Sequence, residues 1–93
     1  MNLRISAGSL VTNHYLEVTD TGVVFCETAA FGGIRNFSYE QIDAVLRGPT
    51  SVSFQVGGET YRIPIKPDSA AHRAAVARLV SEARRTVRRV GGV

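Results

Sequence analysis

The chain lacks several features that would place it in a specialised class of protein. Cys26 is the one cysteine, so no disulfide can form within the chain, and a reducing compartment is the simplest expectation. No apolar run approaches the ~18 residues that a membrane-spanning helix needs. Residues 1–6 lack the basic segment and the hydrophobic core of a signal peptide. The sequence therefore predicts a cytoplasmic protein without an integral membrane segment.

Residue groupings typical of catalysis or metal binding are missing as well. His14 and His72 are the two histidines, and neither belongs to a close pair of the kind that holds zinc. Cys26 stands beside Glu27, whereas a reactive cysteine needs a cationic partner or a helix N-terminus, so a small apolar role in the core is expected. Gly32-Gly33 precedes neither a helix nor a Lys-Ser or Lys-Thr pair, which argues against a phosphate-binding loop. We expect no catalytic residue, no metal and no cofactor.

What is present suits one globular domain. The 93 residues suffice for a single hydrophobic core, and 44% apolar with 20% charged residues is ordinary for a folded protein. We therefore expect a single domain over residues 1–93. Its strands lie at about 3–65, its helix at about 69–88, and a frayed tail covers 89–93.

Short antiparallel strands, six or seven in all, are predicted before residue 66. The clearest pair is 51–56 and 59–65, where apolar and polar residues alternate on either side of Gly57-Gly58, a two-residue hairpin signal. Asp20-Thr21-Gly22 marks another turn, for which glycine supplies a positive φ. Such alternation is typical of an antiparallel sheet with one face in the core. The other expected strands are 14–19, 23–28, 34–38 and 43–47, with one helical turn or bend over 39–42.

After Pro67 the apolar period changes from 2 to 3.6, which predicts a helix from about Ser69 to about Arg88, capped by Asp68 or Ser69. Its apolar stripe is roughly 100° wide and includes His72, which we expect to pack with one ring nitrogen satisfied. The helix would close one end of a curved antiparallel sheet or split barrel, giving an α+β fold. The predicted core comprises Leu16, Val18, Ile42, Val52, Phe54, Tyr61, Ile63, Val76, Leu79, Val80 and Ala83.

The positive charge is concentrated in the predicted helix. Residues 69–93 carry six arginines and one glutamate, a formal charge of +5, whereas residues 1–68 sum to −2. All six arginines fall opposite the apolar stripe, and this set is called the arginine face. Its candidate anion-binding residues are Arg84, Arg85, Arg88 and Arg89. The alternative is a solvated surface whose positive charge favours the C-terminal end of the helix dipole.

The order of strands and helix resembles the pleckstrin-homology-like (PH-like) superfold, and within it the small bacterial PH-like domains. The segments that carry the resemblance are LEVTDTGVVF (16–25), IRNFSYEQIDAV (34–45) and VSFQVGGETYRIPI (52–65). The resemblance covers about residues 16–87 and implies a PH-like fold with Ile42 in its core. Such turn and core residues specify a fold far more than a function.

The resemblance does not extend to the inositol phosphates that some PH domains bind. Those family members place lysines and arginines around the loop between the first two strands of the main hairpin. Here that loop is Asp20-Thr21-Gly22, flanked by Glu17 and Glu27. An acidic loop repels a polyphosphate.

Two functions remain open on the sequence. The first is a non-enzymatic interaction module that binds a protein partner, or a second copy of itself as a homo-oligomer, through a sheet edge or the groove beside the helix. Phe31 and Phe37 are candidate aromatic anchors for such contacts. The alternative is an anionic-surface binder whose arginine face makes weak contacts with membrane lipid headgroups or nucleic acid. Salt separates the two, because phosphate contacts weaken steeply as salt rises.

Overall fold

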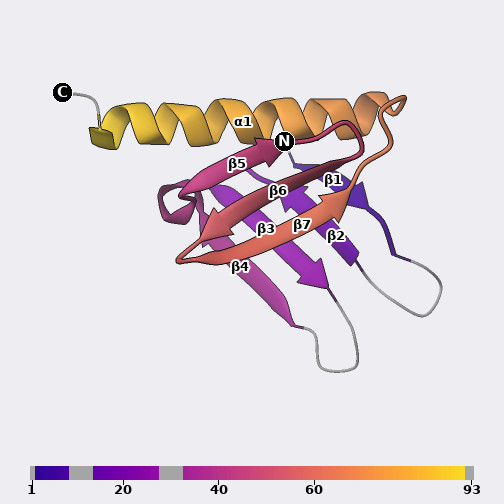
Figure 1. Ribbon diagram of the computed structural model, residues 1–93, viewed down its shortest axis with the longest axis horizontal. Helices are drawn as coiled ribbons and strands as arrows, with labels where there is room; N and C mark the ends of the chain where they lie inside the picture. The colour runs from indigo at the N-terminus through magenta and orange to yellow at the C-terminus, as the bar shows by residue number, and fades with distance from the viewer. Residues whose placement is uncertain (1, 9–13, 28–32, 92–93) are drawn as a thin grey trace.

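The computed structural model describes residues 2–8, 14–27 and 33–91, with side chains described as far as Arg84. In this part of the chain seven strands form two antiparallel sheets, and one helix follows them (Figure 1). The first sheet has the order β1 (Leu3–Ser6), β2 (His14–Val18), β3 (Gly22–Glu27), β4 (Ile34–Ser38). The second has the order β5 (Ala44–Arg47), β6 (Ser51–Val56), β7 (Glu59–Pro64), and the 3-10 turn η1 (Tyr39–Gln41) and helix α1 (Ala70–Gly91) complete the fold.

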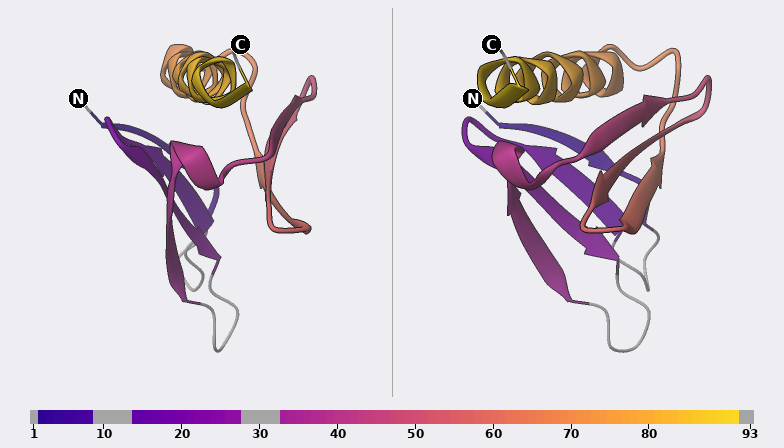
Figure 2. Two further views of the ribbon diagram at one scale, coloured as in Figure 1. Left: turned by 90° about the vertical axis from the view of Figure 1, so that its left-hand side faces the viewer. Right: turned by 60° about the vertical axis from the view of Figure 1, so that its left-hand side comes forward.

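The two sheets stand opposite each other, and α1 lies across one end of the space between them (Figure 2). The predicted α+β class, antiparallel strands and C-terminal helix are confirmed. The prediction of one curved sheet needs a correction, because the described strands form two separate sheets that do not close into a barrel. The break occurs at η1, where the Ser38 N–H donates to the Gln41 side chain (2.8 Å) and the chain turns away from β4. This local capping box ends the first sheet.

Helix α1 begins where the sequence predicts and ends later. The Ser69 hydroxyl accepts a hydrogen bond from the His72 N–H (3.2 Å), which identifies Ser69 as the cap. The His72 ring nitrogen Nδ1 accepts a bond from the Lys66 N–H (3.0 Å), as expected for a half-buried histidine on the apolar stripe. The helix runs to Gly91 instead of ending near Arg88, so the predicted tail over 89–93 is wrong for residues 89–91. No helix-breaking residue precedes Gly91 at this end.

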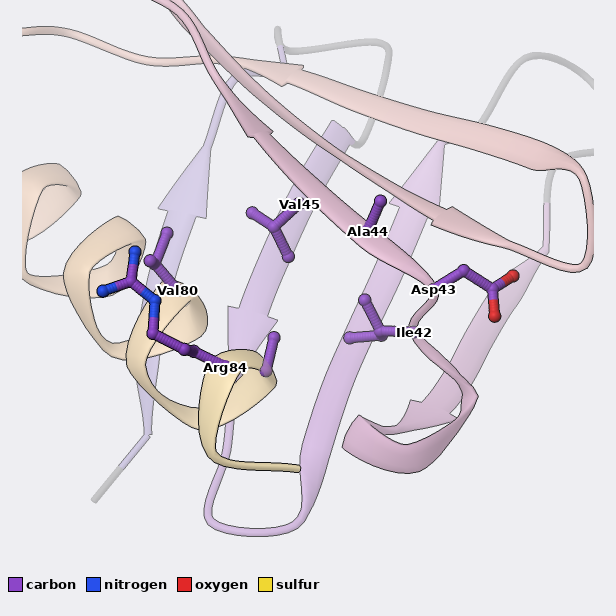
Figure 3. Close-up of a pocket in the computed structure, with 7 residues that line it drawn as sticks. Ile42, Asp43, Ala44, Val45, Val80 and Arg84 are labelled. Atoms are coloured by element: carbon purple, nitrogen blue, oxygen red, sulfur yellow. The ribbon is translucent and has the colours of Figure 1, made fainter. Parts of the chain in front are cut away.

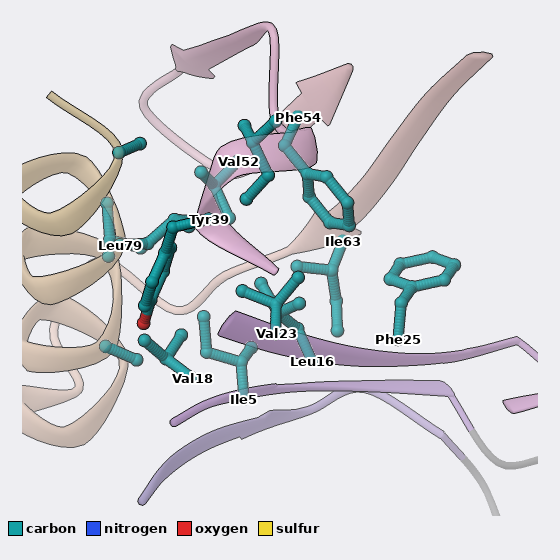
Figure 4. Packing of buried hydrophobic residues seen from close by; sticks show 14 residues of the cluster. Ile5, Leu16, Val18, Val23, Phe25, Tyr39, Val52, Phe54, Ile63 and Leu79 are labelled. Atoms are coloured by element: carbon teal, nitrogen blue, oxygen red, sulfur yellow. The ribbon is translucent and has the colours of Figure 1, made fainter. Parts of the chain in front are cut away.

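The core fills the space between the sheets beneath α1, as Figure 4 shows. Nine of the eleven predicted core residues are buried, whereas Tyr61 and Val80 are only half-buried. The Tyr61 ring stacks on Phe54 (centroid separation 5.3 Å). Cys26 is 3% exposed and unpaired, in agreement with its expected structural role. Buried residues absent from the predicted set include Ile5, Val23, Phe25, Tyr39 and Ala75.

Two turns use glycine for different reasons. Gly57 and Gly58 have φ values of 57° and 87°, the left-handed conformation that the predicted hairpin turn requires. Gly22 does not have a positive φ, so the reason given for it from the sequence is wrong. A Cβ built on Gly22 would lie 2.0 Å from the Phe37 carbonyl oxygen, because β3 and β4 approach closely there. Glycine is therefore required at position 22 because any side chain there would collide with the backbone of β4.

Candidate interaction groove

β5 is an edge strand of the second sheet, and its unpaired edge lies beside α1. β5 pairs with β6 on one side, and no described strand pairs with its other side. α1 contacts β5 on that side, and Figure 1 shows the two lying next to each other. We call the space between β5 and α1, together with the residues at the two ends of β5, the β5–α1 groove.

The backbone of β5 presents hydrogen-bonding groups to this groove. Gly48, just after β5, donates its N–H to the Ser51 carbonyl (2.8 Å) in the turn that leads to β6. Backbone groups alternate in direction along an antiparallel strand, so Leu46 also points toward β6. The N–H and C=O groups of Val45 and Arg47 then point to the free edge. An extended segment of another chain can pair with them where α1 leaves this edge uncovered.

A first hollow lies at the start of β5. It has a volume of about 230 Å³ and is called the Arg84 hollow. Ile42, Ala44, Val45, Val80 and Ala83 supply its apolar lining, and Asp43 and Arg84 its charged residues. The Asp43 carboxylate accepts a hydrogen bond from the Gly57 N–H (2.9 Å), and Figure 3 shows it turned away from Arg84.

A second hollow lies beyond the end of β5. It has a volume of about 320 Å³ and is called the Arg47/Arg73 hollow. The Arg73 guanidinium is held in place because its Nη1 donates to the Pro67 carbonyl (2.8 Å). Arg47 is exposed at the last position of β5. Gly48, Pro49, Ile65, Pro67 and Val76 complete the described lining.

The arginine face is less uniform than the sequence suggests. Arg78 is half-buried and forms an ion pair with Asp20 in the turn between β2 and β3. The hydrogen bond from the Arg78 guanidinium lowers the pKa of the Asp20 carboxyl. Together with the Arg73 bond to Pro67, this contact shows that two side chains of the arginine face bond to other parts of the chain. Among the four candidate anion-binding residues, Arg84 is exposed beside the groove, and the side chains of Arg85, Arg88 and Arg89 lie outside the described ones.

Other features singled out in the sequence lie away from the groove. His14 is half-buried: its ring meets Phe25 edge-on (5.7 Å), and its Nε2 lies 3.2 Å from the Arg62 carbonyl. Phe37 packs on Tyr61 (5.1 Å) and is half-buried, whereas Phe31 lies outside the described residues. The described side chains contain no group of three or more potential metal ligands. Within the same residues, no helix has the length and apolar character needed to cross a bilayer.

Two large apolar side chains are strongly exposed in the part of the chain that the structure describes. Ile34 on β4 is 61% exposed and Leu46 on β5 is 54% exposed, and both strands lie at sheet edges. Edge strands with apolar side chains favour association with another chain. Leu46 thus adds apolar surface next to the β5–α1 groove, whereas β4 offers a second edge without a neighbouring helix.

Sequence analysis placed a strand at residues 43–47 and named a groove beside the helix as a binding surface, but it did not identify the residues that line it. It could not identify Ala44, Val45, Arg47 and Arg73 as residues around one space, because the strand order and the helix position bring them together. The sequence did contain one signal of an exposed edge strand, the charged residue Arg47 at the end of the predicted strand, since charged residues are common on such edges.

Comparison with known protein families, with curated proteins and with solved structures finds no match to this chain. A functional assignment therefore depends on the geometry of the groove and on the charges around it.

Proposed function

We propose that this chain is a non-enzymatic interaction module with a PH-like arrangement of two sheets and a helix. It binds a partner protein by taking up an extended segment in the β5–α1 groove. The observation that carries the proposal is the free edge of β5 beside α1, with a hollow at each end. The four-plus-three strand order followed by a helix supports the PH-like assignment.

Strand addition supplies affinity through the backbone and specificity through the side chains. The outward N–H and C=O groups of Val45 and Arg47 would pair with the backbone of the incoming segment. Alternate side chains of that segment would then enter the hollows at the ends of β5. The mode requires no catalytic group, in keeping with the residues that surround the groove.

The test uses peptides selected on the intact chain from a random twelve-residue display library. Binding of the selected peptides is then measured with Ala44→Trp, which adds a large ring at a residue that lines the Arg84 hollow. Asn36→Trp is the matched control, because it adds the same ring at an exposed position of β4, an edge strand of the other sheet. We expect Ala44→Trp to weaken binding at least about tenfold and Asn36→Trp to leave it unchanged.

Three outcomes would count against the groove. Failure to select peptides, or selection of peptides indifferent to Ala44→Trp, contradicts the proposal. Loss of binding in Asn36→Trp alone transfers the interaction to the β4 edge, where Ile34 is exposed. Sedimentation of the unmodified chain as a dimer that Ala44→Trp dissociates identifies the occupant as a second copy of the chain.

The second candidate is anionic-surface binding by the arginine face. It is favoured by the +5 charge of residues 69–93 and by the exposure of Arg84. Its test is the joint replacement of Arg84, Arg85, Arg88 and Arg89 by Gln. If the surface is only solvated, folding stays nearly intact, because isolated surface charges contribute little.

Binding to anionic vesicles and to nonspecific DNA is measured at two salt concentrations. We expect weak binding by the unmodified chain at ~50 mM salt and almost none near ~200 mM, since few phosphates can touch one short helix. The quadruple variant should not bind at either concentration. Tight binding at the higher salt would rank anion binding above peptide binding.

A further inference from the structure

The two hollows of the β5–α1 groove differ in their charge. The Arg84 hollow contains one arginine and one aspartate, and the Asp43 carboxylate already accepts a hydrogen bond from Gly57. The described lining of the Arg47/Arg73 hollow contains two arginines and no carboxylate. The stronger positive potential therefore lies beyond the end of β5. This excess of positive charge indicates which side chains a bound segment would place in the Arg47/Arg73 hollow.

We infer that the groove selects acidic segments: an Asp or Glu side chain is held by Arg47 and Arg73, next to an apolar side chain seated against Ile65 and Val76. This inference rests on the proposed function and specifies its ligand. The occupant is an extended acidic-apolar segment of a partner protein.

Arg73 is prepared for this role by its bond to the backbone. One Nη1 hydrogen is used by the Pro67 carbonyl at 2.8 Å, which fixes the position of the guanidinium at the edge of the hollow. A guanidinium has five N–H donors in a planar fork, so the others remain to bind a carboxylate. Because the side chain is already held in place, less conformational entropy is lost when the ligand binds.

Arg47 supplies the second charge from the opposite element. It is exposed at the end of β5, and its outward-pointing N–H lies at the free edge by the alternation of the strand. A segment that pairs with β5 at this position thus brings its side chains to the Arg47/Arg73 hollow. Hydrogen bonds between guanidinium and carboxylate are among the stronger ones in proteins, particularly where the surroundings are partly apolar.

The rest of the hollow suits an apolar neighbour of the acidic residue. Pro49, Ile65, Pro67 and Val76 line it together with Gly48. Its volume of about 320 Å³ is at the small end of ligand sites, which fits one or two side chains rather than a large cofactor. A basic segment would meet two like charges here and a further one at Arg84.

The experiment uses the library-selected peptides and amide versions of them, with Asp changed to Asn or Glu to Gln. Binding is measured at ~150 mM salt to the unmodified chain and to the variants Arg47→Gln and Arg73→Gln. Arg62→Gln is the matched control, because Arg62 is an exposed arginine on β7 of the same sheet that lines neither hollow. Resonance assignments and chemical-shift changes of the backbone amides locate each bound peptide.

We expect an acidic residue at a fixed position of the selected peptides. Its amide version should bind about tenfold more weakly, and Arg47→Gln should cause a similar loss. The two changes should not add when combined, since both remove the same contact. Arg73→Gln should weaken acidic peptides and leave their amide versions less affected, whereas Arg62→Gln should leave both unchanged.

The possible failures are distinguishable. In one outcome, peptides no longer bind the Ala44→Trp variant, while their amide versions bind the unmodified chain as tightly as the acidic ones do. That result overturns the inference about acidic side chains and leaves the groove as the binding site. Acidic peptides that respond to Arg62→Gln as strongly as to Arg47→Gln also overturn it. Peptides indifferent to Ala44→Trp contradict the proposed function itself.

Discussion

The two flanks of α1 meet the rest of the molecule in different ways. On the flank toward the first sheet, Ala75 and Leu79 are fully buried, and α1 packs on β1. Arg78 closes this side by its ion pair with Asp20. On the flank toward β5, Val80 and Val45 are only half-buried, and two hollows remain. One helix thus has a sealed flank and an open one.

The difference follows from what each flank faces. The first sheet meets α1 with the edge strand β1, on which Ile5 is fully buried, and with a turn whose Asp20 pairs with Arg78. The second sheet offers the short edge strand β5, which ends at Gly48-Pro49. A small domain that cannot cover every edge leaves one where a partner can bind. The predictions below test this contrast.

The largest effect is expected from truncation on the sealed flank. Leu79→Ala removes a fully buried side chain and should lower the free energy of unfolding by about 2–4 kcal/mol. Val80→Ala on the open flank should cost about 1 kcal/mol or less, because this side chain is smaller and half-buried. Urea unfolding followed by circular dichroism measures both. Equal losses would contradict the contrast, and a loss below about 0.5 kcal/mol for Leu79→Ala would mean a dispensable helix.

A smaller effect is expected from one hydrogen bond beneath the sealed flank. The buried Tyr39 hydroxyl donates to the Thr19 carbonyl (2.5 Å) and ties η1 to the end of β2. Tyr39→Phe keeps the ring and should lower the free energy of unfolding by about 1–2 kcal/mol. Tyr15→Phe is the control, since the half-buried Tyr15 ring packs under the Arg4 guanidinium (4.0 Å). The same unfolding measurement applies, and equal losses in both variants would refute a special role for Tyr39.

The smallest effect concerns pH. The Arg78 guanidinium lowers the pKa of Asp20 below its ordinary 3.8, so the folded state holds this proton less tightly than the unfolded chain does. The stabilisation of the folded state by the Asp20–Arg78 ion pair is therefore fully present above about pH 4. It is lost as the pH falls through the lowered pKa of Asp20 in the folded state. Melting temperatures measured at decreasing pH should show the advantage of the unmodified chain over Asp20→Asn shrinking in acid.

Glu59→Gln, at an exposed position on β7, is the matched control for this titration. Its difference from the unmodified chain should change less with pH in the same acid range. Added salt should reduce the Asp20 effect, because exposed ion pairs are screened. An Asp20→Asn difference that stays constant down to about pH 2 would exclude the ion pair as its cause.

The local elements of this fold are encoded in short stretches of sequence. The alternation around Gly57-Gly58 predicted the β6–β7 hairpin, and the change of period after Pro67 predicted α1 with its cap at Ser69. Most core residues could be predicted because each lies on the apolar face of one element. Tyr61 could not be placed correctly, since its exposure depends on how far Phe25 and Phe37 of the other sheet cover its ring and not on its own strand.

The candidate site belongs to the tertiary structure. Arg73 and Arg78 have the same residue type and lie on one helix, yet one bonds to the Pro67 carbonyl and the other to Asp20 in a distant turn. Gly22 is required because a separate strand approaches it, and the β5–α1 groove exists because β5 remains at a sheet edge beside the helix. Sequence period fixes which face of an element is apolar, since that is a property of neighbouring residues. Which faces and edges meet is decided only when distant segments pack together.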